Sequence, residues 1–188
     1  MGYYRRDLPH WQPQGRLLFV TCRLYGSMPY GWRPGGSGGH AFVEYDRMLE
    51  SATAGPTWMA RAEIAEVVAN SIVYGVARLG RYDLFAWVVM PNHVHVLIDA
   101  AGNLGAIMKT LKGYTAREAN RILRRRGQFW QHESFDHWVR DEHEFRCIAN
   151  YIENNPVKAG LAARPEDYRW SSAFGGISRQ ACASDGAR

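Results

Sequence analysis

The 188-residue sequence predicts a single α+β domain in which helices pack on a small antiparallel sheet of ferredoxin-like type. Three observations predict this fold. The length is that of one domain; an apolar content of 46% is typical of a globular protein; and the apolar patterns occur in the order strand, helix, strand, strand, helix, aromatic segment, helix. The sequence divides into an N-terminal arm (1–16), a domain (17–174) that contains a Gly/Pro-rich loop (26–39), and a flexible tail (175–188).

The first half of the domain contains one strand and two helices. Leu17 to Tyr25 is apolar and rich in β-forming residues, so it predicts the first strand. Residues 41–51 predict a short helix. From Trp58 to Leu79, apolar residues recur every three or four positions, which predicts a long helix that ends at Gly80.

The second half continues with a strand pair and two helices. Residues 84–89 and 93–98 predict two strands joined at Pro91-Asn92. A basic helix follows over 104–126, and then comes an aromatic segment, 128–139, suited to core packing, a strand or base stacking. Asp141 and Glu144 form a capping box for the last helix, which should stop before Pro156.

The second strand of the pair carries two histidines. Alternation along a strand places His93, His95 and Leu97 on one face and Val94, Val96 and Ile98 on the other. Imidazoles at positions i and i+2 of one strand face can converge on a divalent cation. The same pattern also occurs in ordinary strand histidines, so other parts of the chain must decide between the two interpretations.

The positive charge is concentrated in the helix over 104–126. The whole chain has a net charge of +5, and this segment alone carries seven basic residues against the single acid Glu118. A solvated helix face and a phosphate-binding surface are both consistent with such a run. The candidate DNA-binding residues are Lys109, Lys112, Arg117, Arg121, Arg124 and Arg125.

A metal site beside a nucleic-acid surface needs a nucleophile, and two tyrosines qualify by position. Tyr114 lies in the basic helix, and Tyr151 lies in the last helix with Asn155 one turn beyond it. A tyrosine hydroxyl can attack a phosphodiester directly. Position along the chain does not choose between Tyr114 and Tyr151.

Several motifs resemble one family. Met90-Pro-Asn-His-Val-His-Val-Leu97 resembles the metal-binding signature of the single-tyrosine HUH transposases of insertion-sequence type. Asn150-Tyr-Ile-Glu-Asn-Asn-Pro-Val-Lys-Ala-Gly160 is similar to a second element of their relatives, the REP-associated tyrosine transposases. Leu111 to Arg117 and Pro165 to Ser172 are further similarities, so the resemblance extends from about Leu17 to Ser172.

The resemblance implies a specific chemistry. His93 and His95 would be ligands of Mg²⁺ or Mn²⁺, and Tyr151, rather than Tyr114, would be the nucleophile. Insertion-sequence members carry glutamine four residues after the tyrosine as a further ligand, and the shorter Asn155 occupies that place here. The substrate would be single-stranded DNA that contains a hairpin, and the products would be a 5′-phosphotyrosine and a free 3′-hydroxyl.

Two alternatives remain open. The chain could bind DNA hairpins without strand transfer, or it could be a zinc-stabilised domain that uses His132, His137 and Cys147, although their spacing follows no zinc pattern. The absence of long apolar stretches and of a paired cysteine framework predicts a cytoplasmic protein that does not contact a membrane. A monomer and a homodimer are both compatible with the sequence.

Overall fold

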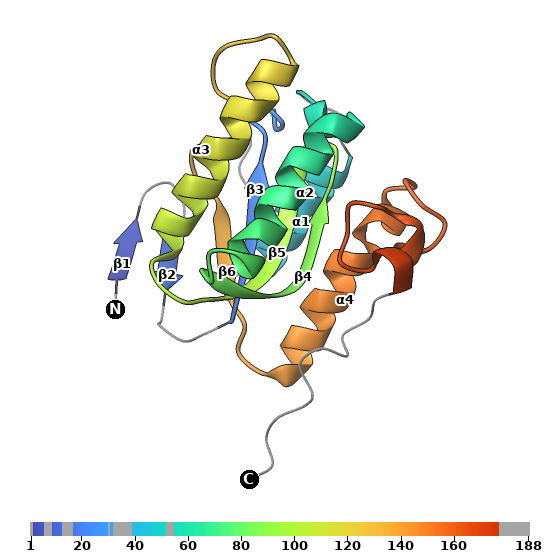
Figure 1. Ribbon diagram of the computed structural model, residues 1–188. Helices are drawn as coiled ribbons and strands as arrows, with labels where there is room; N and C mark the ends of the chain where they lie inside the picture. The colour runs from blue at the N-terminus through green and yellow to red at the C-terminus, as the bar shows by residue number, and fades with distance from the viewer. Residues whose placement is uncertain are drawn as a thin grey trace.

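The computed structural model describes residues 2–5, 9–12, 17–29, 31, 39–51 and 55–176 (Figure 1). Residues 30, 32–38 and 177–188 lie outside the described residues, and with them most of the predicted loop over 26–39 and of the predicted tail over 175–188. No helix among the described residues is long and apolar enough to cross a bilayer.

A four-stranded antiparallel sheet forms the centre of the domain. Its strands are β3 (Leu17–Arg23), β4 (Tyr82–Val89), β5 (His93–Ala100) and β6 (Phe135–Trp138), in the order β4-β5-β3-β6. Helix α2 (Ala62–Ala77) connects β3 to β4, and α3 (Leu104–Ile122) connects β5 to β6. This β-α-β-β-α-β arrangement confirms the predicted ferredoxin-like α+β fold.

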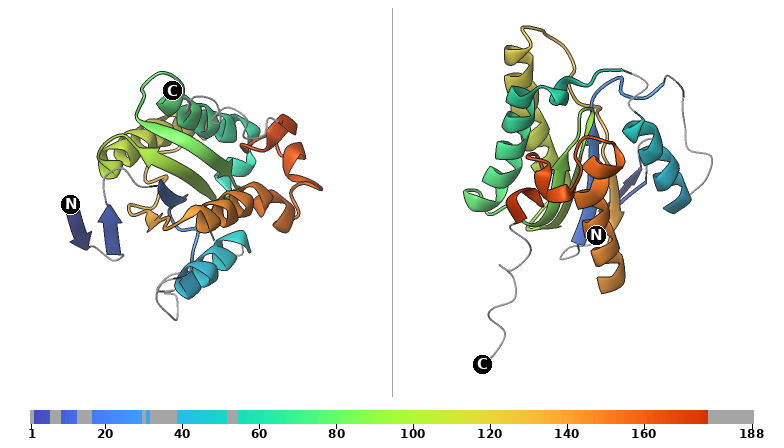
Figure 2. Two further views of the ribbon diagram at one scale, coloured as in Figure 1. Left: turned by 90° about the horizontal axis from the view of Figure 1, so that it is seen from below. Right: turned by 90° about the vertical axis from the view of Figure 1, so that its right-hand side faces the viewer.

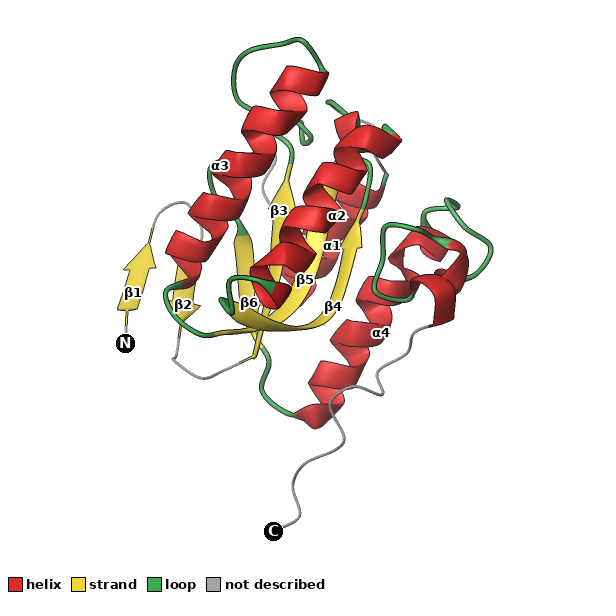
Figure 3. Cartoon of the chain, in the orientation of Figure 1, coloured by secondary structure: helices red, strands yellow, loops and turns green. Residues whose placement is uncertain are grey.

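Two further helices cover the opposite face of the sheet. Helix α1 (Gly39–Glu50) comes between β3 and α2, and α4 (Glu142–Lys158) follows β6. Viewed along the sheet, α2 and α3 lie on one side, and α1 and α4 lie on the other (Figure 2). The predicted N-terminal arm contains a separate pair of antiparallel strands, β1 (Gly2–Arg5) and β2 (Pro9–Gln12) (Figure 3). Short 3₁₀ turns occupy Trp58–Ala60, Pro165–Asp167 and Phe174–Gly176.

The alternation predicted for β5 is confirmed by how the two faces of the sheet pack. Val94, Val96 and Ile98 are buried in the cluster formed with α2 and α3. Leu97 is buried in the second cluster, which contains Ile152 of α4. His93 and His95 share the face of Leu97 and are therefore directed toward α1 and α4.

Three predicted helix boundaries were wrong. The helix predicted to start at Trp58 begins at Ala62, after the 3₁₀ turn over Trp58–Ala60. Helix α3 ends at Ile122 and not at Arg126, because Arg124 takes a left-handed conformation (φ 51°) and the backbone N–H of Arg125 donates to the carbonyl of Asn120. Helix α4 does not stop before Pro156 but continues to Lys158. Pro156 lies in the last turn, where its missing N–H removes one bond while Ala159 still donates to the carbonyl of Asn155.

Candidate metal centre and nucleic-acid surface

His93 and His95 come together with a carboxylate that sequence reasoning missed. Both imidazoles are fully buried, and their ring centroids are 4.6 Å apart. Asp46 of α1 faces them, and one ligand atom from each of the three residues lies within 4.8 Å of the other two. Among the described residues, this is the one group of three or more His, Cys, Asp and Glu side chains close enough to hold a metal ion.

Asn92 fixes the orientation of His93. The Nδ2 atom of Asn92 donates to the backbone carbonyl of Leu49 at 2.9 Å, so its Oδ1 atom faces the Nδ1 atom of His93 at 2.7 Å. Because an amide oxygen only accepts, Nδ1 of His93 must carry the hydrogen. Nε2 of His93 therefore presents a lone pair toward the site. This tautomer suits a metal ligand, whose second ring nitrogen is normally hydrogen-bonded.

His95 is held from the neighbouring strand. Thr21, its partner across β3 and β5, places its hydroxyl 2.8 Å from Nδ1 of His95. On the other side of the ring, Nε2 lies 3.1 Å from Oδ1 of Asp46, but these two atoms do not have hydrogen-bond geometry. Nδ1 of both histidines is therefore occupied, while Nε2 of both remains available to a ligand.

The electrostatics favour donor groups that can bind a cation at neutral pH. Burial, reinforced by the neighbouring His95, lowers the pKa of His93 to about 3, so its imidazole is neutral. Burial is the largest influence and alone would raise the pKa of Asp46, but His95, His93 and Lys158 together outweigh it and hold the pKa below its usual range. Burial and the charge of Asp46 together raise the pKa of Glu50.

Tyr151 and Asn155 of α4 lie at the same site. The ring of Tyr151 is 5.7 Å from that of His95, centroid to centroid, and the ammonium of Lys158 lies 4.3 Å from the centre of the tyrosine ring. Nδ2 of Asn155 donates to the Tyr151 hydroxyl at 3.1 Å and to the carboxylate of Glu50 at 3.2 Å. The site therefore combines β5, α1 and α4 within one chain.

Four buried side-chain atoms of this site have no hydrogen-bond partner: Oδ1 of Asp46, Nε2 of His93, Nε2 of His95 and Oδ1 of Asn155. Leaving a buried polar atom unpaired costs about 1–3 kcal/mol. Four such atoms gathered on one group of side chains need a common explanation. A cation would satisfy all of them, since each atom donates a lone pair once Nε2 of both histidines is free of hydrogen.

Tyr114, the other candidate nucleophile, lies away from these residues. It is 47% exposed on α3, on the opposite face of the sheet, and the guanidinium of Arg117 lies over its ring at 5.5 Å. The structure thus brings Tyr151 to the histidine pair and leaves Tyr114 in the basic helix.

Most of the predicted DNA-binding cations already have partners within the chain. Arg117 and Arg121 both pair with Glu118, at 3.3 and 3.1 Å. Arg125 bonds the side chain of Asn120 and the carbonyl of Gln128, and it stacks on Trp58. In the part of the chain that the structure describes, Lys109 and Arg124 make no ion pair, which leaves them the most available to phosphate.

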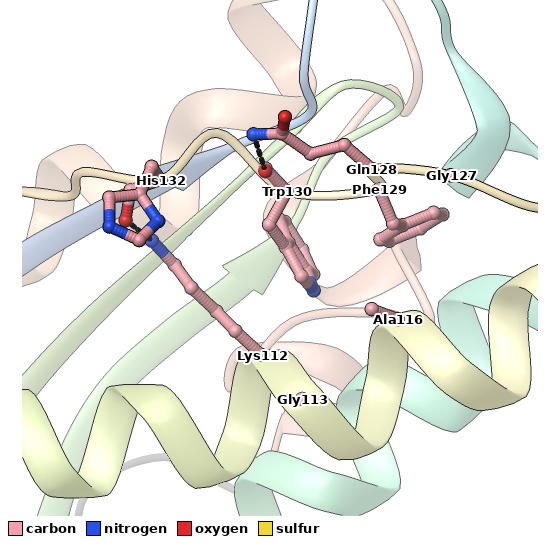
Figure 4. A pocket seen from close by; sticks show the side chains of 8 residues that line it. All are labelled: Lys112, Gly113, Ala116, Gly127, Gln128, Phe129, Trp130 and His132. Atoms are coloured by element: carbon pink, nitrogen blue, oxygen red, sulfur yellow. Dashed lines mark hydrogen bonds between the residues drawn. The ribbon is translucent and has the colours of Figure 1, made fainter.

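Lys112 belongs to a hollow of about 400 Å³ between α3 and residues 127–132 (Figure 4). Its ammonium donates to the backbone carbonyls of Gln131 and His132. Phe129 and Trp130, which line the hollow, are buried at 1% and 5% exposure. These two rings pack in the core, one of the three uses that the sequence left open for this segment, and are not surfaces for base stacking.

The zinc alternative is not supported. His137 bonds Glu144, and Cys147 lies 3.6 Å from His143 instead. Across the ranges that the structure describes, these side chains do not form a ligand group with His132.

Sequence reasoning missed Asp46, Glu50 and Asn92. Asp46 and Glu50 are one turn apart in a segment that was predicted to be helical, so an acidic pair on one helix face was the available signal. Nothing local to residues 41–51 indicates that this face packs against β5 and α4. Asn92 was interpreted only as a turn residue.

Comparisons with known proteins agree with this geometry. The profile described as "Transposase IS200 like" matches residues 59–155, more than half of the chain. A Haemophilus influenzae protein described as "Putative REP-associated tyrosine transposase" is 26% identical over an alignment of 103 residues, and the match covers 48% of this chain and 58% of that protein. This chain therefore matches less than two thirds of the length of that relative.

One solved structure, described as a REP-associated tyrosine transposase bound to a REP hairpin, aligns with 92% of this chain and 83% of its own chain at a TM-score of 0.57. At 19% identity this likeness is one of fold. The family profile includes His93, His95, Tyr151 and Asn155, whereas Asp46 and Glu50 precede it. On the match over residues 59–155, the chain belongs to the IS200-like transposase family.

Proposed function

We propose that this protein cleaves and rejoins single-stranded DNA through a covalent bond to Tyr151. The observation that carries the proposal is the position of the Tyr151 ring beside His95, in a site with four buried polar atoms that have no hydrogen-bond partner. Membership in a transposase family supports a DNA-processing enzyme.

The residues present fit a divalent cation. His93, His95 and Asp46 would hold it, with Asn155 as a fourth ligand through Oδ1. Two imidazoles, a carboxylate and an amide oxygen form a mixed nitrogen and oxygen set, which suits Mn²⁺ and is acceptable to Mg²⁺. When bound, the cation would make the phosphorus more electrophilic by withdrawing charge from the non-bridging oxygens.

The chain's own residues supply the remaining chemistry. The Tyr151 oxygen attacks phosphorus and forms a phosphotyrosine ester with the 5′ side of the cut. The bond from phosphorus to the 3′ oxygen breaks, the phenol loses its proton, and the 3′ oxygen gains one. The ammonium of Lys158, 4.3 Å from the ring centre, adds positive charge beside the place where the attack occurs. Attack by a DNA 3′-hydroxyl on the ester reverses the step and completes strand transfer.

The proposed substrate is single-stranded DNA with a hairpin. The REP hairpin of the structurally similar transposase supports this choice, as does the positive charge of α3. Because Tyr151 lies beside His95 of its own chain, one subunit has the parts of the site, and we propose that Tyr151 acts in cis. We further propose a cytoplasmic location, because Cys22 and Cys147 are free thiols, which suits a reducing compartment. A monomer and a homodimer both remain compatible with this proposal.

The test uses labelled single-stranded hairpins from the flanks of the gene, with Mn²⁺ or EDTA, and detects a protein–DNA adduct that survives denaturation. We expect an adduct with Mn²⁺ that is absent in Tyr151→Phe, while Tyr114→Phe behaves like the wild type. An adduct that persists in Tyr151→Phe and disappears in Tyr114→Phe would move the nucleophile to α3. Tight hairpin binding without any adduct would favour a protein that only binds DNA.

A further inference from the structure

Glu50, at the end of α1, contacts both functional residues of α4. Its Oε1 atom accepts from Nδ2 of Asn155 at 3.2 Å and lies 3.5 Å from the hydroxyl of Tyr151. Asn155 in turn donates to the Tyr151 hydroxyl at 3.1 Å. The three side chains form a closed triangle in which the carboxylate is the only charged member. Glu50 is half-buried, and Asn155 is fully buried.

We propose that Glu50 is a positioning residue of the metal centre, which turns the Asn155 amide so that its oxygen faces the cation and holds the Tyr151 hydroxyl beside it. This inference rests on the proposed function. Glu50 itself would not ligate the metal.

The orientation of the Asn155 amide follows from what each atom can donate or accept. An ionised carboxylate only accepts, so the side of Asn155 that faces Glu50 must be its NH₂ group. The oxygen of Asn155 then points the other way, and it is the oxygen that is buried without a partner. With the amide turned over, Oδ1 would face the carboxylate oxygen and the NH₂ group would face the cation, so both contacts would be repulsive.

Glu50 therefore selects one of the two orientations that the Asn155 amide could take. Asn155 occupies the place where related transposases were inferred to carry a longer glutamine, and an asparagine that rotates freely would present oxygen to the metal only part of the time. A fixed acceptor behind the amide removes the other orientation. Helix α1 thus contributes in two ways, through Asp46 as a ligand and through Glu50 as a support one turn later.

The experiment is a Mn²⁺ titration of the full-length protein. Binding is measured by calorimetry and, independently, by the loss of the electron paramagnetic resonance signal of free Mn²⁺. We expect Glu50→Ala to weaken Mn²⁺ binding by about 10–100-fold, the range typical of lost support behind a ligand. Glu50→Gln should stay close to the wild type, because its amide oxygen can still accept from Asn155. Glu66→Ala on α2, which removes the same charge at an exposed position, is the matched control.

Glu50→Gln separates positioning from charge. If Glu50 acts only as a negative charge near the cation, Gln and Ala will weaken binding equally, and the proposal is overturned. A second comparison uses Asn155→Ala: once Asn155 is absent, Glu50→Ala should have no further effect, whereas additive losses would contradict coupling between the two.

The outcomes also separate this inference from the proposed function. If the wild type binds Mn²⁺ and Glu50→Ala binds it equally well, Glu50 has no positioning role while the metal centre stands. If the wild type does not bind Mn²⁺, the metal centre itself is refuted. Circular dichroism would establish folding first, and where Glu50→Ala is unfolded, Glu50→Asp replaces it, because the shorter side chain withdraws the acceptor from Asn155 and should also weaken binding.

Discussion

The substitution Asn92→Ala would test whether α1 is fastened to the histidine strand through one side chain. Asn92 is 1% exposed and makes two buried hydrogen bonds, one with the carbonyl of Leu49 and one with Nδ1 of His93. Alanine removes both at once. The Leu49 carbonyl and the His93 ring N–H would then be buried without partners.

The two buried hydrogen bonds of Asn92 set the size of the expected loss in the free energy of unfolding. Each buried group left unpaired costs about 1–3 kcal/mol, so two would cost roughly 2–6 kcal/mol. The space vacated by the amide can admit a water that bonds both groups, which favours the lower part of that range, about 2–3 kcal/mol. In a domain of this size such a loss lowers Tm by roughly 4–12 °C. The affinity for Mn²⁺ should also fall about 10–100-fold, because His93 loses the bond that orients it.

Urea unfolding in EDTA would measure this cost, since the chelator removes any stabilisation by bound metal. Asn150→Ala is a suitable control, because Asn150 is an exposed asparagine of α4 that bonds Asn154 within its own helix. A loss for Asn92→Ala below about 1 kcal/mol, equal to that of Asn150→Ala, would refute the reasoning, since a buried bridge would then count no more than an ordinary surface bond.

Two further predictions concern acid stability and DNA. The pKa of His93 is about 3 in the folded chain and near 6.5 when unfolded, so the unfolded state binds more protons between these values. The free energy of unfolding without metal should therefore fall as pH drops from about 6.5 to 5, and it should fall less steeply in His93→Gln. Urea unfolding at a series of pH values measures this, and an equal dependence on pH in both proteins would contradict it. Lys109→Ala and Arg124→Ala should each weaken hairpin binding and lower the slope of log affinity against log salt by about one, measured by fluorescence anisotropy, whereas an unchanged slope would exclude that side chain from phosphate contact.

The sequence predicted correctly those features that depend on interactions between residues close together in the chain. Alternation along β5 was sufficient to place His93 and His95 on one face. Asp141 was sufficient to start α4, because its carboxylate accepts from the Glu144 N–H at 2.8 Å, although the Glu144 carboxylate accepts from the N–H of Arg140 and leaves the predicted capping box half formed. Each depends on residues within a few positions of one another. The same reasoning was wrong at Pro156, because a proline in the last turn costs one bond and the packing of α4 on the sheet outweighs that cost.

The acidic half of the site could not be predicted in this way. Asp46 and Glu50 are separated from the histidines by more than forty residues, and their segment carries no strong periodic signal that specifies which face packs inward. Only the fold, which lays α1 over β5, makes the carboxylates neighbours of the imidazoles. The family profile does not include this helix either, since it begins at residue 59. The residues that complete the metal centre are thus those that local patterns reveal least.

The sheet separates the proposed DNA-binding cations from the proposed catalytic site. The available cations Lys109 and Arg124 belong to α3 and the turn after it, which pack with α2 on one face, whereas Tyr151 and the histidines lie under α1 and α4 on the other. On the proposed function, a hairpin held by α3 would have its duplex on the far side of the sheet from the histidines. The scissile strand would then be a single-stranded extension that passes around the sheet. Binding and chemistry should then be separable: removing metal ligands should leave the salt dependence of hairpin binding unchanged, and removing Lys109 should leave Mn²⁺ affinity unchanged.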